Sequence, residues 1–245
     1  MTAIKLSGLA KTYRRSHLGR VTETVGLDGV DLEVAQGEIF GLLGLNGAGK
    51  TTAMKLALGL LFPTRGSAAV MGCNAGSDGA KRNIGYLPEL PYFYPYLTPV
   101  ESLKFYAGLS GIPACDAAKR IKDILAKVGL EPHAAKRAGE FSKGMLERLG
   151  LAQALIHDPQ VLILDEPVSG LDPLVVWDFR ELFLDLNREG KTIFVSSHSI
   201  SEVEKICTRV AILKAGKLAA IIPQQQWKDA PGGLEEIFVK TVRGK

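Results

Sequence analysis

Gly44-Leu45-Asn46-Gly47-Ala48-Gly49-Lys50-Thr51-Thr52 is the stretch of this sequence that decides its fold class. It matches the pattern of a glycine, any four residues, and then Gly-Lys-Ser/Thr. Glycines of this spacing let the backbone curl so that successive N–H groups point at phosphate oxygens. The apolar run Ile39–Leu43 before it predicts a buried strand, and the residues from about Gly49 to Leu60 predict a helix that Pro63 stops. A strand, loop and helix in this order indicate a phosphate-binding loop rather than an ordinary glycine-rich turn.

The residues of this loop predict contacts with a nucleoside triphosphate. Lys50 is expected to reach the β- and γ-phosphates, and the hydroxyl of Thr51 is expected to bind Mg²⁺. The helix N-terminus adds a partial positive charge that favours the same anion. The residues predicted to touch the nucleotide are therefore Leu45, Asn46, Gly47, Ala48, Gly49, Lys50, Thr51 and Thr52.

Two further predicted strands end in polar side chains. Asp165 and Glu166 follow the apolar run Val161–Leu164, and His198 follows the predicted strand Thr192–Ser197. The carboxyl ends of parallel strands meet at the edge of the sheet where ligands bind. We therefore expect Asp165 to hold Mg²⁺ and Glu166 to polarise the attacking water, with His198 beside the γ-phosphate. A solvated strand end and a structural histidine are the alternatives.

The rest of the chain alternates strands with helices, which predicts an α/β fold with a mostly parallel sheet. Ile4–Leu9 and Val30–Val34 are predicted N-terminal strands, forming an antiparallel β subdomain, and a polar loop is expected between them from Arg14 to Thr24. A helical pattern fills the middle of the chain. We expect a single domain over 1–245, with residues 1–87 and 158–245 as its core and 88–157 as an inserted helical subdomain.

Composition limits the other functions that the chain could have. The net charge of +4 is slight and no long basic run occurs, so nucleic-acid binding is not expected. The three cysteines are far apart, without metal-ligand spacing. No run of about 18 apolar residues predicts a membrane-spanning helix. A role at a membrane is therefore expected to depend on a partner.

Together these motifs resemble those of the ATP-binding cassette (ABC) ATPases, which have a P-loop NTPase (RecA-like) core. Phe141-Ser142-Lys143-Gly144-Met145 is similar to the LSGGQ signature of that family, with Ser142 and Gly144 matching and the other three residues departing from it. Tyr13 aligns with an aromatic residue that stacks on adenine. Residues 169–172 resemble the D-loop, and residues 84–89 occupy the place of the Q-loop, with Glu89 where many members have glutamine. Leu45 replaces a proline common in the family.

The resemblance implies an ATPase that binds ATP with Mg²⁺ and works as a homodimer. In such a dimer Ser142 and Gly144 would bind the γ-phosphate of the ATP held by the other subunit. Glu89 would act as a hinge residue, and as a third Mg²⁺ ligand with Thr51 and Asp165. The partner would be a separate permease that contacts residues 89–106, where Tyr92, Phe93, Tyr94 and Tyr96 either dock it or pack internally.

The departures are similar to those of bacterial exporter cassettes, as is the absence of room for a C-terminal regulatory domain. The implied location is the cytoplasmic face of the membrane. A soluble ABC ATPase without a permease is the main alternative. A GTPase would need a guanine-reading Asn-Lys-x-Asp segment, and a cassette without hydrolysis would be expected to have lost Lys50, Asp165, Glu166 or His198. The basic segment Arg14–Arg20 fits either a solvated loop or a contact with lipid or permease.

Overall fold

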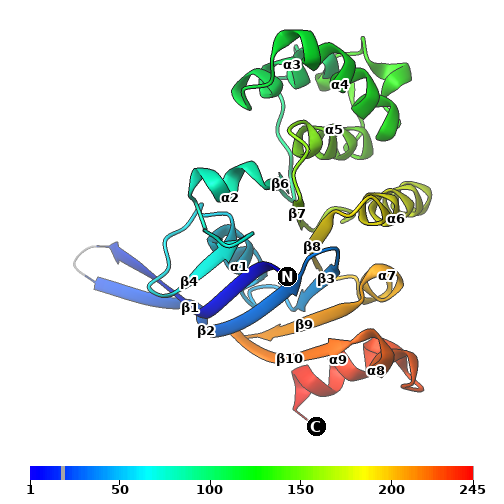
Figure 1. The fold of residues 1–245 in the computed structure, drawn as a ribbon. Coiled ribbons are helices and arrows are strands. Elements are labelled where there is room, and N and C mark those ends of the chain that lie inside the picture. The colour runs from blue at the N-terminus through cyan, green and yellow to red at the C-terminus, as the bar shows by residue number, and fades with distance from the viewer. Residues whose placement is uncertain (18–19, 245) are drawn as a thin grey trace.

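The computed structural model describes residues 1–17 and 20–244 and is built on two sheets (Figure 1). The larger sheet has the strand order β10-β9-β3-β8-β7-β6. Its neighbouring strands are parallel, except that β9 and β10 are antiparallel. Its strands are β3 (Ile39–Gly44), β6 (Ile84–Leu87), β7 (Val161–Asp165), β8 (Thr192–Ser197), β9 (Arg209–Lys214) and β10 (Lys217–Pro223).

Helices cover both faces of this sheet, so its central strands have no polar face. Successive residues of one strand enter opposite cores: Leu162 and Leu164 pack into one, and Val161 and Ile163 into the other. The helices outside the insertion are α1 (Lys50–Ala57), α2 (Asp78–Arg82), α6 (Pro173–Arg188), α7 (Ile200–Ile206), α8 (Gln224–Lys228) and α9 (Gly233–Arg243). Helix α1 packs on the face toward the smaller sheet, while α6, α7 and α9 pack on the other.

The smaller sheet is antiparallel and has the order β2-β1-β4-β5. Its strands are β1 (Thr2–His17), β2 (Arg20–Ala35), β4 (Arg65–Val70) and β5 (Cys73–Asn74). The outer part of the β1–β2 hairpin extends away from the rest of the molecule (Figure 1), while its inner part pairs with β4 and packs in a core.

The prediction of a polar loop from Arg14 to Thr24 is wrong. Tyr13 pairs with Thr24 and Arg14 with Glu23 in a regular ladder, and Arg14 also forms a 2.7 Å ion pair with Glu23. This part of the hairpin covers no core, so its residues lack the alternation by which a half-buried strand is recognised. Leu18 and Gly19 of the basic segment lie outside the described residues.

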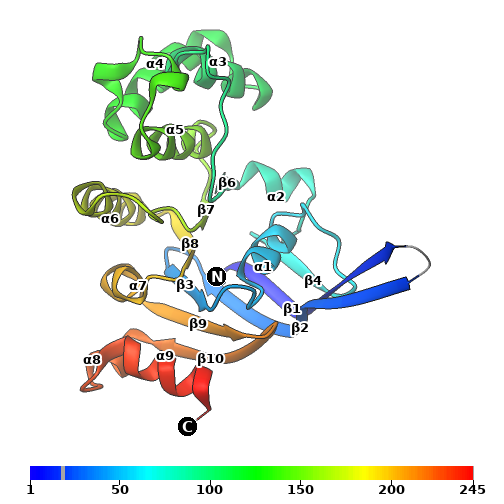
Figure 2. The same ribbon diagram turned by 180° about the vertical axis from the view of Figure 1, so that it is seen from behind.

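Three helices follow β6 and precede β7 in the chain. They are α3 (Pro99–Leu109), α4 (Ala114–Lys127) and α5 (Lys143–Leu155), with short 3₁₀ turns at Glu131–His133 and Ala138–Glu140. Helix α5 packs against β6, while α3 and α4 lie farther from both sheets (Figures 1 and 2). Thr98 and Glu101 form a capping box at the start of α3, and Ser142 caps α5. Over residues 1–17 and 20–244, none of the helices combines the length and apolar character required to cross a bilayer.

The fold class predicted from the sequence is confirmed: an α/β chain with a mostly parallel sheet, an antiparallel N-terminal sheet and an inserted set of helices. Strands β4 and β5 and helices α2 and α8 were not predicted. Each of them has seven residues or fewer, too short to show a clear hydrophobic period.

Candidate functional site

A cavity of about 580 Å³ opens where β3 and β8 end and where β7 passes into Glu166. Most of the residues predicted to bind a nucleotide line this cavity, although they come from distant parts of the sequence. The lining consists of Tyr13, Thr24, Val25, Gly26, Leu45, Asn46, Gly47, Ala48, Gly49, Lys50, Thr51, Thr52, Glu89, Glu166 and His198.

The phosphate loop joins β3 to α1 and forms one wall of the cavity. Gly49 has a φ of 107°, and a Cβ atom there would lie 2.5 Å from the carbonyl oxygen of Gly26. Both the backbone conformation and the space therefore require glycine. Helix α1 begins at Lys50, whose buried ammonium donates to the carbonyl of Gly44 at 2.8 Å. The loop is thus folded with its cation already in place.

The carboxylate of Glu166 connects the phosphate loop to the end of β8. Its Oε1 lies 3.4 Å from Nζ of Lys50, and its Oε2 lies 2.7 Å from Nδ1 of His198 and accepts from the backbone N–H of His198 at 3.1 Å. Glu166 is buried and has a φ of 52°, a left-handed conformation that non-glycine residues seldom adopt. Such strain persists where the surroundings hold it, and it is concentrated at functional sites.

Asp165 lies behind this carboxylate, at the last position of β7, and is not among the cavity-lining residues. Its Oδ1 accepts from the hydroxyl of Ser196 at 2.6 Å, and the same hydroxyl oxygen accepts from the backbone N–H of Glu166 at 3.1 Å. Ser196 therefore fixes both members of the acidic pair. The sequence analysis did not single it out, and the available signal was its place two residues before His198 on the neighbouring strand.

Tyr13 and Glu89 also line the cavity. The hydroxyl of Tyr13 lies 3.1 Å from Oγ1 of Thr52, and a Cβ atom at Gly26 would lie 2.6 Å from the Tyr13 ring. Glu89 follows β6, close to Tyr86. Burial, together with the negative charges of Asp165 and Glu89, raises the pKa of Tyr86 to about 12. The site therefore brings several carboxylates near each other, of which Glu166 lies beside the Lys50 ammonium.

Ser142 and Gly144 do not line this cavity. Ser142 lies at the start of α5, where its hydroxyl oxygen accepts from the backbone N–H of Met145 at 3.4 Å. Gly144 packs on α6: a Cβ atom there would lie 3.1 Å from Cγ1 of Val175. Of all the residues predicted for the site, the structure thus separates these two and Asp165 from the cavity surface.

The aromatic residues between β6 and α3 divide into two groups. Tyr92, Tyr94 and Tyr96 are 50–80% exposed. Phe93 is buried and packs edge-on against Tyr106 with ring centroids 6.2 Å apart. This segment therefore has three exposed tyrosines and one buried phenylalanine that packs against α3.

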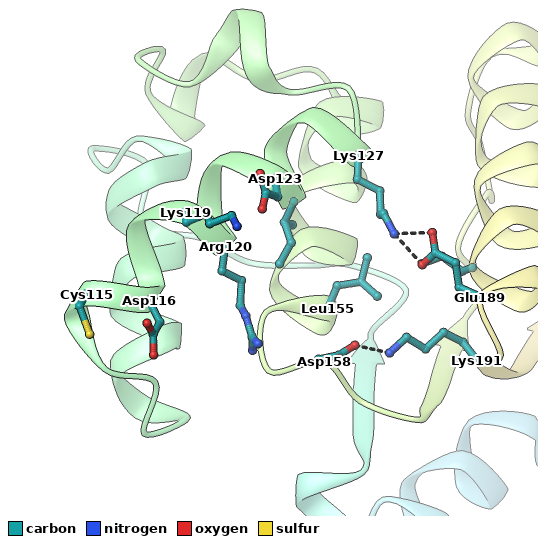
Figure 3. Close-up of a pocket in the computed structure, with 12 residues that line it drawn as sticks. Cys115, Asp116, Lys119, Arg120, Asp123, Lys127, Leu155, Asp158, Glu189 and Lys191 are labelled. Carbon is teal, nitrogen blue, oxygen red and sulfur yellow. Dashed lines mark hydrogen bonds and ion pairs between the residues drawn. The ribbon is translucent and has the colours of Figure 1, made fainter.

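A second cavity, of about 460 Å³, lies away from the phosphate loop, between α4 and the C-terminal end of α6 (Figure 3). Two ion pairs join charged side chains of its lining. Lys127 of α4 lies 2.6 Å from the Glu189 carboxylate, and Lys191 pairs with Asp158. These pairs join the inserted helices to the larger sheet and its helices, rather than forming a reactive centre.

Comparison with known proteins places this geometry in a family. The sequence profile described as "ABC transporter" matches residues 27–169, which include the phosphate loop, the acidic pair and Ser142. The chain belongs to the ABC transporter family. An uncharacterized ABC transporter ATP-binding protein of Nostoc is 49% identical over 219 residues, or 89% of this chain and 65% of that relative. The bacitracin transport ATP-binding protein BcrA of Bacillus licheniformis is 41% identical, covering 91% of this chain and 70% of BcrA.

Solved ABC cassettes have the same fold as this one. The bacterial ABC transporter cassette MJ0796, whose structure is described as dimeric, superimposes with a TM-score of 0.81 at 25% identity, over 90% of this chain and 98% of that one. This ABC cassette spans about two thirds of the length of the Nostoc relative, 65%. The family match and these relatives place the chain among the ABC transporter ATP-binding proteins.

Proposed function

We propose that this ABC cassette hydrolyses ATP to power a membrane transporter. The observation that carries the proposal is the contact of Glu166 with both Lys50 and His198 in the cavity formed by the phosphate loop. A γ-phosphate beside Lys50 competes with Glu166 for the ammonium, because both are anions. Once released from Lys50, the Glu166 carboxylate can accept a proton from the attacking water. His198 would orient that water and contact the γ-phosphate.

Magnesium fits the oxygen atoms available at the site. Mg²⁺ prefers oxygen ligands and keeps several waters, so a nucleotide and one or two protein groups are enough. Thr51 and Asp165 would hold the ion, with Glu89 as a third candidate, and the ion would neutralise charge that develops on the phosphates. Within the ranges that the structure describes, no three His, Cys, Asp or Glu side chains gather into a metal site made by protein alone. This agrees with an ion that arrives with its nucleotide.

The proposed working unit is a homodimer with two ATP molecules between the subunits. Ser142 and Gly144 lie outside the cavity of their own chain but at a helix N-terminus, a position suited to an anion. In the dimer they would bind the γ-phosphate of the ATP held by the partner, and Tyr13 would stack on adenine in its own chain. The dimeric cassette MJ0796 supports this arrangement. ATP would close the dimer because it binds the closed state more tightly.

The proposed membrane partner is a separate permease that docks on residues 89–106. The exposed side chains of Tyr92, Tyr94 and Tyr96 support this, since exposed aromatic residues form interface anchors. The cassette would then lie on the cytoplasmic face of the membrane. Export is the proposed direction, and it rests on Glu89 and on the departures from the signature at residues 141–145, which are similar to those of exporter cassettes. The name of BcrA assigns that relative to bacitracin transport without giving a direction. Co-purification with a multi-span permease would separate this proposal from a soluble ABC ATPase.

The oligomeric state of Glu166→Gln tests the proposal directly. We expect this variant to bind ATP, to hydrolyse it at least about 100-fold more slowly, and to shift from monomer to dimer when Mg-ATP is added. Light scattering after size exclusion reports the mass. Adding Ser142→Arg to the same chain provides the control, since it should remove the dimer and spare binding. Undiminished turnover by Glu166→Gln would show that this carboxylate is not the base.

A further inference from the structure

Lys143 connects the signature segment, residues 141–145, to the D-loop, residues 169–172. Its ammonium donates to the backbone carbonyl of Ser169. A methyl group at Gly170 would lie 3.2 Å from the same Nζ, so the lysine approaches the D-loop backbone closely. Lys143 stands in the sequence between Ser142 and Gly144, and it departs from the LSGGQ pattern, in which this position is glycine. The contact is therefore a property of this chain's own sequence.

The same D-loop residue is joined to the proposed catalytic carboxylate of its own chain. The backbone N–H of Ser169 donates to the carbonyl of Glu166 at 3.1 Å. Hydrogen bonds and covalent links thus run without a gap from Ser142 through Lys143 and Ser169 to Glu166. If Ser142 binds the partner's ATP, as proposed above, this path runs from one nucleotide site to the other.

Other contacts hold the inserted helices α4 and α5 on α6 but do not reach the D-loop. Arg148 forms a 2.5 Å ion pair with Asp178 and lies over the ring of Phe179, 5.6 Å from its centroid. Farther along, Lys127 pairs with Glu189 at the C-terminal end of α6 (Figure 3). Removing Lys143 would therefore leave the helices packed while releasing the D-loop from the signature segment.

We infer that Lys143 is a positioning residue that couples the two nucleotide sites of the dimer through Ser169. This inference rests on the proposed dimeric function. Binding of the partner's γ-phosphate by Ser142 would fix the start of α5, and the lysine would carry that position to the D-loop and so to Glu166. An ammonium group has three donors and one compact charge, so it can keep the Ser169 carbonyl while α5 shifts by a small amount. A coupling path is established only when removing it changes cooperativity.

The test compares three variants of the full chain: Lys143→Met, Lys143→Arg, and Lys127→Met as a matched control that removes another lysine contact to the α6 region. ATP hydrolysis is measured against ATP concentration. For Lys143→Met we expect a Hill coefficient that falls from above 1 to about 1 and a kcat about tenfold lower. Lys143→Arg should restore both values, because arginine can also donate to a carbonyl, and Lys127→Met should match the wild type.

Dimer formation is measured in the same variants on the Glu166→Gln background. Lys143→Met should still dimerise with Mg-ATP, because the signature Ser142 is intact. Loss of that dimer would mean that Lys143 binds the γ-phosphate itself, which overturns a positioning role. An unchanged Hill coefficient, an equal effect of Lys127→Met, or failure of Lys143→Arg would overturn it as well. If Glu166→Gln alone does not dimerise and the wild type shows no cooperativity, the dimeric function fails and the inference fails with it.

Discussion

Nδ1 of His198 lies 2.7 Å from Oε2 of Glu166, and the backbone N–H of His198 donates to the same oxygen at 3.1 Å. Two donors from one residue fix the orientation of a buried carboxylate. We expect His198→Ala to lower kcat about 100-fold, because a positioned acid–base pair contributes at least that much, while the affinity for ATP stays within about twofold. Steady-state hydrolysis and nucleotide titration check this. His133→Ala, at an exposed histidine outside the site, is the control and should have no effect. A loss of affinity without a loss of kcat would contradict the assignment.

Lys50 pairs with Glu166 in this structure and would exchange that carboxylate for phosphate oxygens when ATP binds. Lys50→Ala is expected to weaken nucleotide binding by about 10- to 100-fold, since it removes a charged hydrogen-bond donor from a buried site. Equilibrium titration with a fluorescent ATP analogue measures the change. Lys55→Ala, on the exposed side of the same helix, should bind as the wild type does. Equal affinity of the two variants would remove Lys50 from the phosphate site.

Ser142 caps α5 and lies outside the cavity of its own chain. Ser142→Arg should leave nucleotide binding by the monomer intact and block hydrolysis that depends on the dimer, because its bulk occupies the place of the partner's γ-phosphate. Losing the cap alone would cost about 1 kcal/mol of stability, so Ser142→Thr, which keeps a capping hydroxyl, is the control. ATPase rates measured over a range of protein concentrations report the outcome. Undiminished hydrolysis by Ser142→Arg would rule out a site shared between subunits.

Arg209 of β9 pairs with Glu38, which lies in the connection between β2 and β3. Nε and Nη2 of Arg209 lie 2.6 and 2.8 Å from the two oxygens of Glu38, whose side chain is 9% exposed. Arg209→Met would leave that carboxylate buried without its cation, so we expect the free energy of unfolding to fall by about 2–3 kcal/mol. Urea denaturation measures the change. Lys5→Met removes an ion pair in which both side chains are 55% exposed, and should change stability by less than about 0.5 kcal/mol.

Glu147 gives the protein a pH-dependent stability. Burial raises the pKa of Glu147 from 4.5 to about 8. The positive charge of Lys143 lowers this pKa, and the negative charge of Glu89 raises it further. Its Oε2 has no hydrogen-bond partner among the described residues. The folded state therefore keeps a proton that the unfolded state loses above pH 4.5, and the contribution of this group to stability falls as pH rises toward 8.

Glu147→Gln cannot ionise and should remove that dependence. We expect the stability of the variant relative to the wild type to increase by roughly 1–3 kcal/mol between pH 4.5 and pH 8, and to change little at higher pH. Urea denaturation at several pH values in this range checks the direction. Glu131→Gln, at an exposed position, serves as the control. A difference that stays constant with pH would show that Glu147 is ionised in the folded protein.

The phosphate loop could be predicted because its geometry depends on consecutive residues. Glycines at fixed spacing and a following Lys-Thr permit one backbone path, and the apolar run Ile39–Leu43 before them indicates a strand of the larger sheet. Asp165, Glu166 and His198 could be predicted for a related reason. Each follows an apolar strand, and parallel strands bring their carboxyl ends to one edge.

Contacts between distant segments were decided only by the tertiary structure. Ser196 came to hold both acidic residues because β8 pairs with β7 in the register that sets it opposite Asp165. Nothing local distinguishes its hydroxyl from that of Ser197. The outer part of the β1–β2 hairpin was missed because it covers no core, so no apolar pattern marks it, whereas the inner parts of both strands belong to a core and were predicted.

The sequence by itself determined that a glycine-rich loop between a strand and a helix, and two carboxylates at the end of a strand, exist in this protein. The tertiary structure decided which partner each charge takes: Glu166 with Lys50 and His198, Arg209 with Glu38, and Lys143 with the Ser169 carbonyl. The reason is physical. Backbone conformation is limited by neighbouring residues, whereas a flexible charged side chain pairs with whatever group the packing of distant elements places within its reach.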